Sequence, residues 1–94
     1  KQLYHSQYVT VAGVVIRRQQ PLSRAIFLTL EDEFGHISLI VWPKTYRSLK
    51  NILESPLITV GGRVSRREET FNIIVDTAER IQEHTITFFS RDWA

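Results

Sequence analysis

The hydrophobic and polar positions of this 94-residue chain follow two periods, and the shorter one covers most of the sequence. Apolar residues that alternate with polar ones predict strands, because side chains on a strand point in turn to its two faces. One stretch, Pro43–Leu53, instead has apolar residues at helical spacing, and its proline suits a first helical turn. The predicted strands are Val9–Arg17, Ala25–Leu30, His36–Trp42, Leu57–Ser65 and Thr70–Val75.

Polar, charged and glycine-containing connections separate these strands. A polar connection over Arg18–Arg24 follows the first strand. A tight acidic turn over Glu31–Gly35 follows the second strand, and a charged turn over Arg66–Glu69 follows the fourth. Beyond the fifth strand, Asp76–Glu83 is predicted as a short helix and Thr85–Phe89 as extended. The order of the main elements is therefore strand, strand, strand, helix, strand, strand.

Glycines predict where the two longest strands bend. Gly13 lies in the first strand and Gly61-Gly62 in the fourth, and a strand that turns a corner favours a residue without a side chain. Five strands bent in this way, with a helix between the third and the fourth, favour an all-β fold, the five-stranded Greek-key barrel called the OB-fold. We expect residues 1–83 to form this single domain and residues 84–94 to form a C-terminal tail.

Residue parity assigns the two faces of the second and third strands. In the second strand the aliphatic residues are predicted to face the core, which leaves Phe27 and Thr29 on the outer face. Large apolar groups on the outside of a barrel require a covering partner such as a helix, a protein or a nucleobase. The predicted core residues of the two strands are Ile26, Leu28, Leu30, Ile37, Leu39 and Val41, and the third strand is expected to turn outward His36, Ser38, Ile40 and Trp42.

Basic residues are concentrated in the main body of the chain. Residues 1–75 hold ten Lys and Arg against six Asp and Glu, and nine of the twelve basic residues of the chain are arginines. An OB-fold binds oligonucleotides on its second and third strands, between the connections after strands one and four. Those connections carry arginines, which bind phosphate, around a surface with aromatic rings, on which bases stack. The candidate nucleic-acid-binding residues are Arg17, Arg18, Arg24, Phe27, Thr29, Ser38, Trp42, Lys44, Arg63, Arg66, Arg67 and Asn72.

The candidate residues have different expected roles. Phe27 is expected to stack a base, with Trp42 as a second stacking platform, although Trp42 can instead seal the barrel against the helix that it precedes. Arg66 and Arg67 are followed by two glutamates that can neutralise them. The other basic candidates are expected to contact phosphates, and the expected hydrogen-bonding groups for bases are Thr29, Ser38 and Asn72.

The chain lacks the groups on which most catalytic and cofactor sites depend. It has no cysteine, its three histidines (His5, His36 and His84) show no metal-ligand spacing, and it has no glycine-rich phosphate loop. We therefore predict a non-catalytic domain without cofactor, metal or small-molecule substrate. Because it also lacks an apolar run of membrane-span length and an apolar leader, we expect the cytoplasm and no membrane partner.

Five short motifs of the chain point to one protein family. They are V-A-G-V-V-I-R-R-Q at 11–19, F-L-T-L-E-D-E at 27–33, V-W-P-K at 41–44, G-R-V at 62–64 and S-R-D-W at 90–93. Together they resemble the OB domain of bacterial DNA polymerase III alpha subunits. V-W-P-K and G-R-V are typical of the error-prone, damage-associated branch, and S-R-D-W is similar to the terminal S-R-D-F of that branch. The resemblance implies a C-terminal accessory domain that holds single-stranded template near the active site, whereas the catalytic aspartates belong to a separate palm domain.

The sequence thus predicts a single-stranded DNA-binding OB module of an error-prone polymerase III alpha-like protein, whose partners are single-stranded DNA and other polymerase subunits or accessory proteins. Two alternatives remain open. A protein-docking or self-association module would use the outer apolar residues together with Phe88, Phe89 and Trp93 of the tail. An RNA-binding OB domain of the anticodon type would recognise the 2′-hydroxyl, which only RNA offers.

Overall fold

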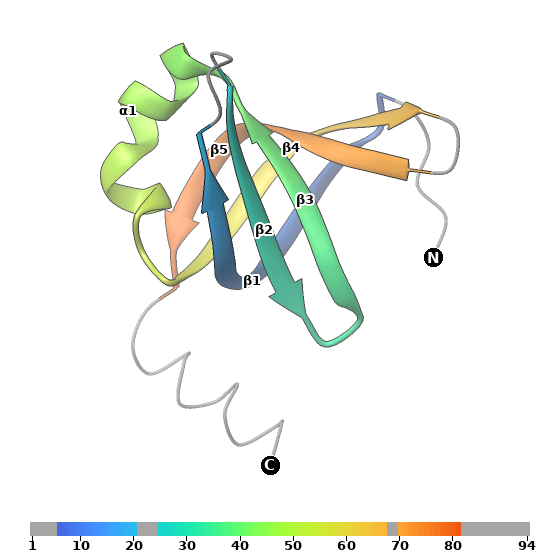
Figure 1. The fold of residues 1–94 in the computed structure, drawn as a ribbon, viewed down its shortest axis with the longest axis horizontal. Helices are drawn as coiled ribbons and strands as arrows, with labels where there is room; N and C mark the ends of the chain where they lie inside the picture. Colours follow the sequence, from blue (N-terminus) through green and yellow to red (C-terminus); the bar gives the residue numbers. More distant parts are fainter. Residues whose placement is uncertain (1–5, 21–24, 68–69, 82–94) are drawn as a thin grey trace.

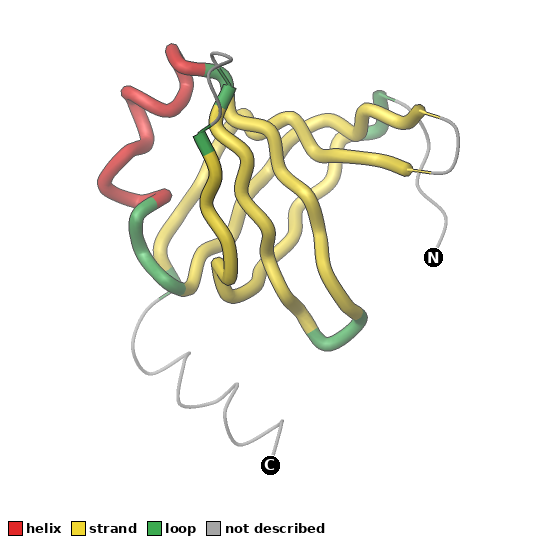
Figure 2. Tube along the Cα trace, in the orientation of Figure 1, coloured by secondary structure: helices red, strands yellow, loops and turns green. Residues whose placement is uncertain are grey.

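The computed structural model describes residues 6–20, 25–67 and 70–81, and it forms a closed five-stranded barrel in the order β1-β2-β3-β5-β4 (Figure 1). One helix, α1, lies between β3 and β4 along the chain and packs at one end of the barrel (Figure 2). This architecture confirms the predicted OB-fold. The elements are β1 (Tyr8–Gln19), β2 (Ile26–Asp32), β3 (Gly35–Val41), α1 (Pro43–Leu53), β4 (Leu57–Arg67) and β5 (Thr70–Arg80).

The core consists of the inward-facing aliphatic residues of β2, β3, β4, β5 and α1, and partly buried valines of β1 pack against it. In β2 and β3 the predicted parity is confirmed, because Leu28, Leu30, Leu39 and Val41 are almost completely buried while Phe27 is half buried on the other face. Ile37 was predicted in the core and is only partly buried, since it lies near the end of the barrel that α1 does not cover. Within the described residues no polar or charged side chain is buried, so the barrel interior is purely apolar.

Strand β1 bends because it pairs with two different neighbours. Residues Tyr8–Val14 pair with β4, and residues Val14–Gln19 pair with β2. Gly13 lies at this change of partner, where an added Cβ would come within 2.7 Å of the Glu31 carbonyl oxygen. The predicted bend is therefore correct, although the irregularity in register falls slightly later, between Val15 and Arg17.

The glycine pair in β4 allows the second bend. The register between β4 and β5 shifts between Gly61 and Gly62, as a β-bulge does. A Cβ on Gly62 would overlap the Ile74 carbonyl oxygen, so the backbones of the two strands can meet here only at a glycine. This confirms the bend predicted for the fourth strand.

Helix α1 has the predicted bounds, and its apolar side packs on the barrel. Leu53 is buried, and Tyr46, Leu49 and Ile52 pack against the core cluster. Trp42, predicted as the last residue of the third strand, is instead the N-cap residue of α1, because Pro43 occupies the first helical position. Among the described residues, no helix is long and apolar enough to cross a membrane.

One predicted element is wrong. The segment Asp76–Glu83 was expected to begin a short helix, but residues 76–80 continue β5, where Ala78 is buried and pairs with Val60. Backbone pairing with β4 outweighs the weak local preference of this polar segment for a helix. The predicted extended segment Thr85–Phe89 and the tail over 84–94 lie outside the described residues.

The barrel closes through a short parallel seam between β3 and β5. Its register consists of the pairs Leu39–Ile73 and Ile40–Ile74, which is fewer than in each of the four antiparallel pairings. The two strands separate beyond this seam, and the β2–β3 and β4–β5 hairpins extend from the barrel in different directions (Figure 1). The outer surface of the seam is the centre of the candidate site.

Candidate nucleic-acid interface

A continuous row of side chains crosses the outer face of the barrel over four strands and the start of β1. Cross-strand partners place side chains on the same face, and strand pairing links each member to the next. We call this the outer row: Phe27, Ile40, Ile74, Arg63 and Tyr8. It combines aromatic rings, an aliphatic centre and one guanidinium group, which suits the stacking of bases next to a phosphate backbone.

A second, polar row runs beside the outer row. Arg17 pairs with Thr29, and Thr29 pairs with Ser38 on β3. On the other side of the seam Asn72 pairs with Ser65. Leu39 and Ile73 are paired across the seam. Ser38 and Asn72 each directly precede one of these two residues, so their side chains lie on the same face. Hydroxyl and amide groups thus border the apolar centre, as expected for groups that hydrogen-bond bases.

The far end of the β2–β3 hairpin is acidic and internally bonded. The Asp32 carboxylate accepts hydrogen bonds from the backbone N–H groups of Phe34 (2.8 Å) and Gly35 (3.0 Å), and Gly35 has a φ of 135° that favours glycine. Glu31 lies 3.6 Å from the imidazole of His36 across the strands. Because carboxylates repel phosphate, this hairpin end is a poor surface for a nucleic-acid backbone, and we leave it out of the candidate interface.

Tyr8 is a member of the outer row that the sequence analysis missed. Tyr8 is 46% exposed, and the Arg63 guanidinium carbon lies 5.8 Å from the ring centroid, within cation–π distance. The Tyr8 hydroxyl is 3.5 Å from the hydroxyl of Thr77, and Arg63 donates a hydrogen bond of 3.2 Å to the Ser6 carbonyl oxygen. The stacked pair is therefore held in place while the ring keeps an exposed side. The sequence shows an aromatic residue next to the predicted first strand, which was the available signal. It does not show that this residue pairs with β4.

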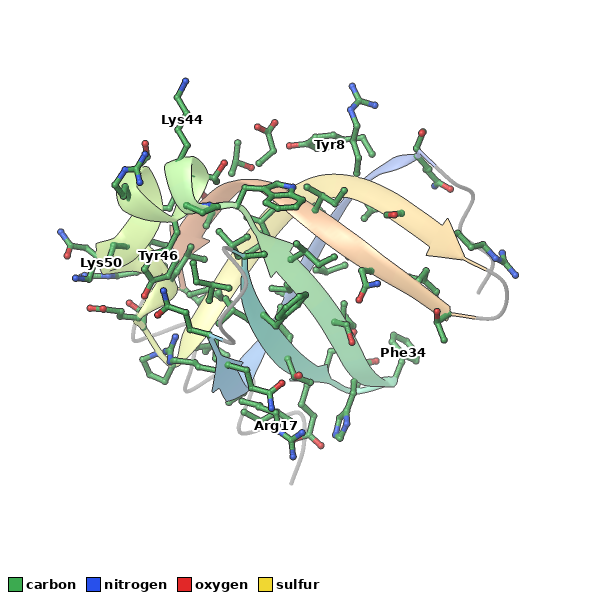
Figure 3. All side chains as sticks on the ribbon, turned by 45° about the horizontal axis from the view of Figure 1, so that its top comes forward. Tyr8, Arg17, Phe34, Lys44, Tyr46 and Lys50 are labelled. Carbon is green, nitrogen blue, oxygen red and sulfur yellow. The ribbon has the colours of Figure 1, made fainter. Side chains whose placement is uncertain are left out.

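Trp42 and Lys44 lie on the same side of the molecule as Tyr8. Trp42 is 50% exposed, and it lines a shallow depression that also includes Arg63 and Ile74. Figure 3 shows Lys44, in the first turn of α1, and Tyr8 projecting on this side, whereas Arg17 and Phe34 lie toward the opposite edge of the view. The structure thus brings Trp42, Lys44 and Arg63 toward one region, with Arg17 at a separate edge.

Arg18 has a different environment from its neighbour Arg17. It is paired with the buried Leu28, so it points to the inner side of the strand, where its guanidinium donates to the Leu53 carbonyl oxygen at 2.6 Å and to the Ser55 carbonyl oxygen at 3.5 Å. Leu53 is the last residue of α1 and Ser55 follows just after its C-cap, so both carbonyls lie at the C-terminal end of the helix, where a cation is favourable. The Arg18 guanidinium therefore contacts the C-terminal end of α1 and does not lie on the outer face.

Of the remaining sequence candidates, Arg66 lies apart from the outer row. Arg66 is in β4, paired with Phe71 on the extended β4–β5 hairpin, and its side chain is exposed with an interaction of its own. The backbone of Arg67 pairs with Thr70. The side chain of Arg67 and the whole of Arg24 lie outside the described part of the chain.

Comparison with known proteins agrees with this architecture. The family described as an OB-fold nucleic acid binding domain matches residues 9–81, which is most of the chain. The chain belongs to this OB-fold family. Among solved structures, the OB-fold domain is similar to asparaginyl-tRNA synthetase from Pyrococcus horikoshii (TM-score 0.68, 23% identity, 83% of this chain and 20% of that chain). It is also similar to a replication protein A heterotrimer bound to ssDNA (TM-score 0.65, 17% identity, 93% of this chain and 67% of that chain). These likenesses show the fold.

The OB-fold domain also matches a segment of error-prone DNA polymerases. It is 38% identical over 78 residues to the error-prone DNA polymerase of Sinorhizobium medicae, covering 80% of this chain and 7% of the relative. It is 44% identical over 71 residues to that of Teredinibacter turnerae, covering 72% of this chain and 7% of the relative. The chain therefore spans a small fraction of the length of these relatives, and the resemblance to the error-prone branch is confirmed for that segment.

Proposed function

We propose that this OB-fold domain binds single-stranded DNA as an accessory domain of an error-prone DNA polymerase and holds the template strand. The observation that carries the proposal is the outer row, in which the half-buried Phe27, the exposed Tyr8 and the Arg63 guanidinium form one path across the barrel. Family membership supports nucleic acid as the ligand, and the polymerase relatives support DNA.

The geometry suggests how the strand is held. Bases stack on Phe27 and on the indole of Trp42, each worth about 1–3 kcal/mol. Arg63 and Lys44 contact phosphates on one side of the stacked bases, and Arg17 contacts a phosphate at the other edge. The polar row, with Thr29, Ser38 and Asn72, offers hydrogen bonds to base edges without fixing a sequence.

Fluorescence anisotropy with a labelled oligo-dT at several salt concentrations tests this proposal. With about three phosphate contacts, the logarithm of the association constant should fall with the logarithm of salt at a slope near −2, since each contact on a single strand contributes about −0.7. The matched pair Lys44→Ala and Lys50→Ala locates the contact surface. Both lysines are exposed on α1, but Lys50 projects away from the side that carries Tyr8 and Lys44 (Figure 3).

The Lys44→Ala variant should lower the slope by about 0.7 while Lys50→Ala leaves it unchanged. Equal effects of the two substitutions would show a diffuse attraction rather than a defined path. The absence of salt-dependent binding to any single strand would reject the proposal. Competition with an oligo-U of the same length would separate this function from RNA binding, because only RNA carries the 2′-hydroxyl.

A further inference from the structure

A shallow depression beside the outer row combines apolar surface with two opposite charges. We call it the Trp42 depression. It lies over the middle of β5, the strand between β3 and β4, and it is bordered by the end of β3, the first turn of α1 and β4. Its lining residues are Trp42, Thr45, Arg63, Ile74, Val75 and Asp76.

The apolar part of the depression suits the face of a nucleobase. Trp42 is 50% exposed, and Ile74 is half buried in the centre of the outer row. Ile40 pairs with Ile74 across the seam, and Trp42 and Asp76 each follow two residues later. The Trp42 ring therefore lies just beyond the end of β3, beside Asp76 in the middle of β5. A flat aromatic ligand can therefore stack on the indole with its edge toward the polar groups.

The polar part of the depression is unusual for a surface that attracts phosphate. Asp76 is exposed, and among the described residues no cation lies within ion-pair distance of its carboxylate. A carboxylate in this place repels the backbone of a nucleic acid, but it accepts hydrogen bonds from the N–H groups of a base. Arg63 lies on the neighbouring strand β4, where it pairs with Ile74. Its guanidinium carries several N–H donors, so it can donate to a base edge in addition to the phosphate contact proposed above.

Of the four DNA bases, guanine presents the edges that match these two groups. Its N1–H and N2–H₂ groups are adjacent donors that fit the two oxygens of a carboxylate, and its O6 and N7 atoms are adjacent acceptors that fit a guanidinium. Adenine and cytosine offer one amino group to a carboxylate, and thymine offers one ring N–H. Base edges are available in this way only in an unpaired strand.

We propose that the Trp42 depression is a guanine-selective subsite, in which the base stacks on Trp42, donates to Asp76 and accepts from Arg63. This inference rests on the proposed function, since it assigns a base preference to one position of the same strand-binding surface. It makes the domain more selective than a surface of aromatic rings and phosphate contacts alone.

Anisotropy titrations of the full 94-residue chain with three labelled oligonucleotides test the subsite: oligo-dT, the same strand with one central guanine, and the same strand with hypoxanthine in that place. The guanine strand should bind about fivefold to tenfold more tightly than oligo-dT, and hypoxanthine, which lacks the N2 amino group, should give a smaller gain. Asp76→Asn should bring the ratio of guanine to thymine affinity close to one. Glu79→Gln, which removes the same charge from another exposed position of β5, should keep the ratio.

The outcomes of these titrations distinguish the guanine subsite from the proposed single-strand binding. Equal affinity for all three strands, or a guanine preference that Asp76→Asn leaves intact, overturns the guanine subsite and leaves strand binding in place. Absence of salt-dependent binding to every strand overturns the proposed function and the subsite with it. Circular dichroism of both variants confirms that their barrels fold, so that a changed ratio reports on recognition.

Discussion

Phe27 and Phe34 are aromatic residues of the same β2–β3 hairpin with very different surroundings. Phe27 lies in the outer row, is half buried and pairs with Ile40, whereas Phe34 lies in the turn and is 80% exposed. The acidic residues around the turn separate Phe34 from any phosphate path. Exposure alone is therefore a poor guide to stacking, because a platform also needs a fixed ring and neighbouring cations.

We expect Phe27→Ala to weaken binding of oligo-dT at least fivefold, because one stacked base is lost. Phe34→Ala, a matched removal of a benzyl group, should leave the affinity unchanged. Anisotropy titration measures both, and Phe27→Leu adds a check by keeping most of the apolar packing while removing the ring. If Phe34→Ala weakened binding as much as Phe27→Ala, the strand would run over the hairpin turn instead of the outer row.

Gly61 and Gly62 are adjacent glycines with unequal constraints. A Cβ on Gly61 would come within 2.8 Å of the Thr77 and Tyr8 hydroxyl oxygens, which belong to side chains that can move. A Cβ on Gly62 would meet the Ile74 backbone, which cannot move without breaking the pairing with β4.

We predict that Gly62→Ala destabilises the domain by about 2 kcal/mol or more, and that Gly61→Ala costs clearly less. Urea unfolding followed by circular dichroism gives both values. A reversed order would mean that the β4–β5 bulge can relax, contrary to the close approach in the structure.

Helix α1 is attached to the barrel by arginines at its C-terminal end as well as by its apolar side. Arg18 of β1 donates to the Leu53 carbonyl oxygen, and Arg80 of β5 donates to the Asn51 carbonyl oxygen at 3.3 Å. The last carbonyls of a helix have no partners within the helix and carry a partial negative charge. Two strands therefore supply the donors that this helix end needs.

Arg17 and Arg18 should accordingly respond in opposite ways to the same substitution. We expect Arg18→Met to lower the free energy of unfolding by about 1 kcal/mol with little change in DNA affinity. Arg17→Met should leave stability unchanged and reduce the salt dependence of binding by about one phosphate contact. Thermal unfolding and salt-dependent anisotropy measure the two effects. If Arg18→Met weakened DNA binding and Arg17→Met did not, Arg18 and not Arg17 would be the residue that contacts DNA.

Most of the barrel could be predicted from the sequence, because alternation in β2 and β3 and the helical spacing of Pro43–Leu53 are local patterns. The continuation of β5 to Arg80 could not, since it depends on pairing with β4 and not on the polar residues themselves. The interface was predictable only in part for the same reason. Parity identified Phe27, but the position of Tyr8 next to Arg63, the inward direction of Arg18 and the place of Asp76 all follow from register between distant strands.

The short seam between β3 and β5 has a consequence for the motions of the whole barrel. Proteins open locally where the fewest interactions must break, and here only the pairs Leu39–Ile73 and Ile40–Ile74 join the two strands. Separation along this line would expose amide hydrogens to deuterium. A DNA strand that stacks on Trp42 and hydrogen-bonds to β5 would contact both sides of the seam. Such binding favours the closed barrel and should therefore resist the separation of β3 from β5.

Deuterium uptake should therefore fall at Leu39 and Ile73 when oligo-dT saturates the domain, although both side chains are buried away from solvent. Amides of the long β4–β5 ladder, such as Val60 and Ala78, should change little, since ten pairs already secure it. If the exchange rate of the Leu39 amide did not change at saturating DNA, the DNA strand would have to bind at another surface. If the domain binds DNA as proposed, the bound and free forms would then differ in the rigidity of this seam, without any large displacement of the backbone.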